Sequence, residues 1–175
     1  MTFPPRRLAT LLCAMLLAAC APALDWREVR SDLSGATALF PCKPKSQSRA
    51  ATLVGTAVPM TLVSCEVDGV TFALGHAELG DPSHVTPALI ELRASLKANL
   101  GASEGRPSVF GLAGMTPNPQ AVRISLVGRL PDGTPVQEQA ALFVRGTRVY
   151  QVVVLGKRLD EGAVDVFFDS LRLSP

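Results

Sequence analysis

Two histidines and an aspartate are the side chains whose chemistry would be most useful at a catalytic site. His76, Asp81 and His84 lie close together in the sequence, and imidazole and carboxylate groups serve as general bases and metal ligands. No nucleophile or third metal ligand accompanies them at a recognisable spacing. Ser64 has no Gly-x-Ser-x-Gly context and is no nucleophile elbow. The sequence therefore predicts surface or packing histidines, with no catalytic residue, no cofactor and no metal.

The N-terminal stretch has the pattern of a secretory signal peptide. Arg6 and Arg7 precede twelve uncharged, mostly apolar residues, 8–19. A membrane-spanning helix needs about 20 apolar residues, so this run has instead the length of a signal-peptide apolar region. It ends in the small pair Ala18-Ala19, directly before Cys20. We expect residues 1–19 to be a signal peptide.

The stretch Leu17-Ala18-Ala19-Cys20 resembles a bacterial lipobox. The resemblance implies that the Cys20 thiol is joined to a diacylglyceryl group, that the chain is cut before Cys20, and that the new amine is acylated. Two or more acyl chains hold a protein stably on a membrane. Residue 21 is Ala rather than Asp, which in Gram-negative lipoproteins implies transfer to the outer membrane. The alternative is ordinary cleavage after Ala21 or Ala23, with Cys20 discarded.

Two of the four cysteines then remain available to form a disulfide. Cys13 leaves with the signal peptide and Cys20 carries lipid, so Cys42 and Cys65 remain in an oxidising compartment. We predict a disulfide between them. Two buried thiols or a redox pair are the alternatives, although the sequence has no Cys-x-x-Cys motif. Metal binding by these cysteines and the two histidines lacks a close ligand spacing.

Charge balance excludes one class of partner. Removing residues 1–19 takes away two arginines and no acid, which leaves 15 basic and 15 acidic residues in a 156-residue chain. Without a positive surplus, nucleic-acid binding has no electrostatic basis. Lys43, Lys45 and Arg49 form the one basic cluster. They would face acidic lipid headgroups or, more simply, protect a solvated strand edge.

Hydrophobic periodicity predicts strands and two helices. Leu89, Leu92, Leu96 and Leu100 form one apolar helix face between Thr86, a candidate N-cap, and Gly101. Asp160 can cap a second helix. Segment 101–118 is rich in Gly, Pro and Ser and predicts a loop. Strands are expected at 36–40, 48–54, 59–67, 70–77, 121–130, 136–144 and 148–155, with a tight hairpin turn at Asp68-Gly69.

This order predicts an α+β fold with an antiparallel sheet of about six to seven strands packed by two helices. LFPCKPK (residues 39–45) and RVYQVVVLGKRLDEGAVDVFFDSLRL (residues 148–173) resemble the first and last elements of PsbP-like domains. The resemblance implies a PsbP-like α/β/α sandwich and an accessory or binding role, without a shared catalytic residue. We expect residues 20–35 to be the lipidated N-terminus and tether, and 36–175 one domain.

These observations predict a non-enzymatic accessory or binding module. Its lipid would anchor it in the outer membrane, where it would face the periplasm and bind an envelope protein or a small apolar ligand. We expect the binding surface to lie beside the 101–118 loop, because loops on a rigid sheet commonly carry function. Two alternatives remain: a periplasmic enzyme whose polar residues, including His76, Asp81 and His84, converge only on folding, and a purely structural envelope lipoprotein.

Overall fold

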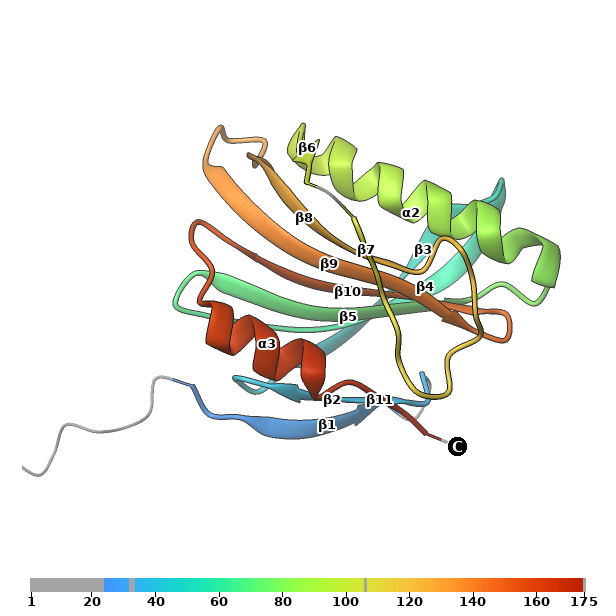
Figure 1. The fold of residues 1–175 in the computed structure, drawn as a ribbon, viewed down its shortest axis with the longest axis horizontal. Coiled ribbons are helices and arrows are strands. Elements are labelled where there is room, and N and C mark those ends of the chain that lie inside the picture. The colour runs from blue at the N-terminus through green and yellow to red at the C-terminus, as the bar shows by residue number, and fades with distance from the viewer. Residues whose placement is uncertain (1–23, 32–33, 106, 175) are drawn as a thin grey trace, which may run out of the picture.

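The computed structural model describes residues 24–31, 34–105 and 107–174 (Figure 1). The predicted signal peptide, residues 1–19, and the predicted lipidation site, Cys20, lie outside the described residues. The described chain is α+β, as predicted, and consists mostly of antiparallel strands with two α-helices.

The main sheet has eight antiparallel strands in the order β3-β4-β5-β10-β9-β8-β6, with β7 also paired to β8. The prediction of about six to seven strands was too low. β6 and β7 have two residues each, which is too short to show a periodic pattern, and they form by pairing with β8 in the folded chain. The strands are β3 (Lys45–Leu53), β4 (Thr56–Val67), β5 (Val70–Glu78), β6 (Ser103–Glu104), β7 (Ser108–Val109), β8 (Val122–Arg129), β9 (Pro135–Arg145) and β10 (Arg148–Gly156).

A second, three-stranded sheet has the order β1-β2-β11. Its strands are β1 (Arg27–Ser31), β2 (Ala36–Phe40) and β11 (Arg172–Leu173). Most of the region interpreted as a tether, residues 20–35, lies outside the described residues or in loops, but its part in β1 pairs residue by residue with β2. The ordered fold therefore includes residues before position 36.

Two α-helices complete the fold. α2 (Val85–Leu100) follows the short 3₁₀ turn η1 (Pro82–His84) and ends at Gly101, whose φ of 51° is the left-handed value that favours glycine. The helix begins before Thr86, so the prediction of Thr86 as its N-cap was wrong. α3 (Glu161–Asp169) begins as predicted, because Asp160 accepts a hydrogen bond from the backbone N–H of Ala163 at 2.8 Å.

The main sheet lies between two layers of the fold (Figure 1). It separates two apolar cores. α2 packs over β8, β9 and β10 on one face. α3 and the three-stranded sheet cover the other face. Alternate residues of β10 therefore face different layers: Val149 and Val153 pack under α2, whereas Val152 and Val154 pack under α3. This explains why β10 reads as an almost continuous apolar run.

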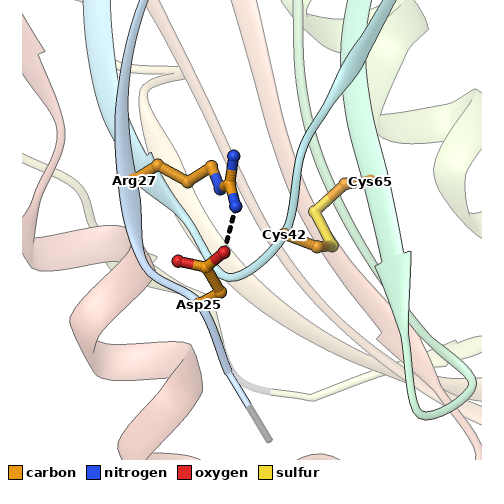
Figure 2. Close-up of a disulfide and its surroundings, with 4 residues drawn as sticks. All are labelled: Asp25, Arg27, Cys42 and Cys65. Carbon is orange, nitrogen blue, oxygen red and sulfur yellow. Dashed lines mark hydrogen bonds and ion pairs between the residues drawn. A yellow bond between two sulfur atoms is a disulfide. The ribbon is translucent and has the colours of Figure 1, made fainter. Parts of the chain in front are cut away.

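The predicted disulfide joins Cys42 and Cys65, with their Cα atoms 5.9 Å apart (Figure 2). Cys42 follows β2 of the small sheet, whereas Cys65 lies in β4 of the main sheet. Figure 2 also shows the nearby ion pair between Asp25 and Arg27 at the start of β1. The bond therefore connects the two sheets covalently at the margin of the α3-side core, against which both sulfur-bearing residues pack.

Candidate functional site

A groove of about 540 Å³ lies between α2 and the β3–β4 hairpin. Figure 1 shows the hairpin beside the helix. Apolar and neutral polar side chains from three strands and the helix form its walls and floor. They are Gln47, Ala51, Thr52, Leu53, Met60, Leu62, Leu92, Ser95, Asn99 and Gln151, together with one charged residue, Arg49.

The groove exists because α2 covers only part of its face of the sheet. The helix packs over β8, β9 and β10, so β3 and β4 extend past its flank. The hairpin tip is fixed to the helix by Glu91, whose Oε2 accepts a hydrogen bond from the backbone N–H of Val54 at 2.7 Å. Leu53 and Leu92 are buried at 5% exposure each, which closes the groove near this tip.

The hairpin tip also holds an unfavourable backbone conformation. Val54 has a φ of 51° and Gly55 a φ of 73°. A positive φ is an outlier for a β-branched residue and costs of the order of 1–3 kcal/mol. Glycine or asparagine would adopt it readily. Strain of this kind concentrates where function requires a particular shape, and here it lies at the end of the groove.

Gly75 shapes the groove floor from β5. It pairs with Leu62 of β4 and Gln151 of β10, two residues that line the groove. A Cβ atom at Gly75 would lie 3.1 Å from Cε of Met60 and 3.4 Å from Cδ1 of Leu62. A larger residue would therefore push these two side chains into the groove and reduce its volume.

The charge at the groove is positive. Arg49 donates through Nη2 to Oε1 of its neighbour Gln47 at 3.1 Å, and no acidic residue is among the described groove walls. A hollow of about 330 Å³ continues past Gln47 and is lined by Lys43 and Lys45, with Glu66 as its acid. The basic cluster predicted from the sequence therefore borders the apolar groove.

The histidines and Asp81 do not form a common site. His76 is buried on the α3 side of β5, with its ring centroid 6.4 Å from that of Tyr150. Burial, and secondarily the charge of Arg148, lower the pKa of His76. Asp81 accepts hydrogen bonds from the N–H and hydroxyl of Ser83 and caps η1. His84 directly precedes α2. None of the three lines the groove or its extension.

Glu138 is a further ionisable residue in an unusual setting, and sequence reasoning missed it. It is only 5% exposed, and its Oε1 has no hydrogen-bond partner among the described residues. The register places it opposite Leu126 of β8 and Leu155 of β10. Burial raises its pKa to about 7. The signal was available, because Val136, Glu138 and Ala140 alternate on the same buried face.

The 101–118 segment does not border this groove. Its strands β6 and β7 cover the β8 edge of the sheet, and its Phe110 packs 5.3 Å from Phe143, between ring centroids. An open hollow beside Gly101 is lined by Asn99, Leu100, Arg129, Pro131, Pro135 and the exposed Val127. The apolar groove that gathers side chains from helix and hairpin instead lies toward the opposite edge of the sheet.

A further hollow of about 530 Å³ lies at the start of α3, on the other face of the sheet. Its apolar lining includes Leu24, the first described residue, and Phe72. Its charged lining includes Asp160, which is engaged in capping α3, as well as Asp68 and Arg158. Acidic side chains at this hollow give it a different character from the groove beside α2.

Within the described ranges, no set of three or more histidine, cysteine or acidic residues could hold a metal ion, and no described helix has the length and apolar character needed to cross a membrane. Neither the known protein-family models nor the curated proteins contain a match to the chain.

Proposed function

We propose that this protein is a non-enzymatic binding module of a bacterial cell envelope, and that the groove between α2 and the β3–β4 hairpin binds a small apolar ligand. The groove carries the proposal: most of its lining is apolar or neutral, and its one charged group is an arginine rather than a general acid–base pair. Ligand sites are commonly concave and apolar, with a few placed polar groups that fix orientation.

The proposal includes a lipid anchor at Cys20 and an outer-membrane location facing the periplasm. The lipobox-like sequence before Cys20 and Ala21 after it support this part. The disulfide between Cys42 and Cys65 is consistent with an oxidising compartment. We also propose a PsbP-like fold, supported by the two sequence stretches that resemble such domains and by the helix layers on both faces of the sheet.

The anchor is tested by Cys20→Ser. We expect cells fed a labelled fatty acid to acylate the wild-type protein and not this variant. Because the substitution removes the thiol that forms the thioether, labelling of Cys20→Ser protein to the wild-type level would rule out this anchor.

The groove is tested with a neutral long-chain alcohol that carries a diazirine for photocrosslinking and an alkyne for detection. The full-length protein is mixed with phosphatidylcholine vesicles containing the probe, and the labelled peptides are mapped. We expect labels in β3, β4 and α2. Leu62→Gln should weaken labelling about tenfold, because it removes an apolar groove contact worth about 1.4 kcal/mol.

Val166→Gln is the matched control. Val166 is 42% exposed on α3, against 39% for Leu62 in the groove, so both substitutions place an amide at a similarly exposed apolar position. Labelling should be unchanged by Val166→Gln. Labels distributed over both faces of the sheet, with equal effects of the two substitutions, would contradict the proposed function.

A further inference from the structure

Along one face of β3, the side chains that border the groove change from cationic to apolar. Because side chains alternate along a strand, Lys45, Gln47, Arg49, Ala51 and Leu53 all face the α2 side of the sheet. The first three of these are exposed, Ala51 is half-buried and Leu53 is buried. One strand therefore presents charge at its start and an apolar surface at its end.

The facing strand β4 repeats this gradient. Lys45 is opposite Ser64, Gln47 opposite Leu62, and Arg49 opposite Met60. The guanidinium therefore projects from a position flanked by apolar groove residues, while the lysine lies beyond them. From Arg49 to Leu53 the strand spans about 13 Å, at roughly 3.3 Å for each residue. This length accommodates much of one extended hydrocarbon chain.

Arg49 has unused binding capacity. Its guanidinium carries five N–H donors, of which one N–H group bonds Gln47. Arg49 takes part in none of the ion pairs found among the described residues. With Lys43 and Lys45, three cations border the groove and its extension, against the single acid Glu66. The local charge is therefore complementary to an anion.

From this arrangement we infer that the groove takes a single-chain anionic amphiphile of the long-chain fatty-acid class. The hydrocarbon chain lies along Met60 toward Leu53 and Leu92, and the carboxylate lies at Arg49, with Lys45 beyond it. A carboxylate accepts two parallel hydrogen bonds from a guanidinium, which a hydroxyl cannot do. The inference rests on the proposed apolar groove and adds the charge of the head group.

The test compares two photoreactive probes of equal chain length, a fatty acid and its fatty alcohol. Each is presented to the full-length protein in neutral phosphatidylcholine vesicles, and labelling of groove peptides is measured over a range of probe concentrations. We expect the carboxylate to label the wild-type groove at about tenfold lower concentration than the alcohol does, which corresponds to about 1.4 kcal/mol.

Arg49→Gln should remove this preference, so that the fatty acid and the alcohol label the groove at similar concentrations. Lys157→Gln, which removes an exposed cation in the loop after β10, is the matched control and should keep the preference. Excess unlabelled palmitate should displace the fatty-acid probe from wild-type protein.

Three results would overturn the inference. Equal labelling by both probes at the groove would leave the proposed apolar site standing and remove its charge selectivity. Groove labelling by neither probe would overturn the inference and the proposed function together. A preference that depends on Arg49 only in vesicles containing phosphatidylglycerol would assign the cation to an anionic membrane surface instead.

Discussion

Replacing Glu138 by glutamine should make the protein more stable at alkaline pH. Glu138 lies on the α2 face of β9, with only 5% of its surface exposed and apolar residues opposite it on both neighbouring strands. A carboxylate buried without a partner is costly, whereas the neutral acid or an amide of the same shape avoids the charge. Burial therefore raises its pKa to about 7 from an ordinary value of 4.5.

The sign and size of this change in the free energy of unfolding follow from proton linkage. Between pH 4.5 and pH 7 the folded chain holds a proton at Glu138 that the unfolded chain releases, so the free energy of unfolding falls as pH rises. The contribution is fully present below pH 4.5 and fully lost above about pH 7. At 1.36 kcal/mol for each pKa unit, the whole shift is worth about 3 kcal/mol. Of this, about 2.5 kcal/mol falls between pH 5 and pH 8.

Urea denaturation at pH 5 and pH 8 measures this effect. The free energies of unfolding of wild type and Glu138→Gln should be similar at pH 5, and the variant should be more stable by about 2.5 kcal/mol at pH 8. The difference between the two proteins is the useful quantity, because the lowered pKa of His76 makes stability rise with pH in both. Glu66→Gln is the control, since Glu66 is exposed on β4.

A parallel change in the free energies of unfolding of wild type and Glu138→Gln between pH 5 and pH 8 would contradict an unpaired buried acid. A variant less stable than wild type at pH 8 would contradict it too, because that result would mean that the ionised carboxylate has a stabilising partner. In either case Glu138 would not be an uncompensated buried acid.

Three further experiments, each with its own substitutions, test how the fold is held together. Replacing Cys42 and Cys65 by alanines should lower the free energy of unfolding in urea by about 3 kcal/mol, as expected for a loop of 23 residues. Non-reducing peptide mapping of the wild-type protein should recover the two linked peptides. Gly128→Ala should destabilise by about 1–3 kcal/mol, because a Cβ there would lie 2.4 Å from a backbone carbonyl oxygen at the end of α2, whereas Gly111→Ala meets open space and should be tolerated. Val54→Asn should stabilise by about 1 kcal/mol, since asparagine accepts the positive φ that valine resists.

Local signals in the sequence predicted most of the main sheet. Asp68 and Gly69 adopt φ values of 52° and 72°, as a two-residue hairpin turn requires, and β4 pairs with β5 from Val67–Val70 outward. Asp160 caps α3 as its position before an apolar helix face indicated. These features depend on neighbouring residues, and therefore a single sequence is sufficient to reveal them.

Features that depend on distant contacts were not predictable in the same way. β1 is held by pairing with β2 and carries no strong strand pattern of its own. The groove depends on where the hairpin passes the flank of α2. It also depends on Gly75, because the absence of a side chain there leaves room for Met60 and Leu62 beneath the groove. Glu138 was within reach of the sequence, because a glutamate occupied an inward position of an alternating strand.

The two edges of the main sheet differ in a way that explains the position of the groove. At one edge, the 101–118 segment supplies β6 and β7, which pair with β8 and cover it. At the other edge, β4 is the one strand among the described residues that pairs with β3, and the polar residues of β3 are exposed along most of its length. Cations on an open edge discourage pairing with other strands. Lys45 and Arg49 can meet that need and also face the groove, because both project from the same side of β3; therefore protection of the edge and recognition of an anion are compatible roles for the same residues.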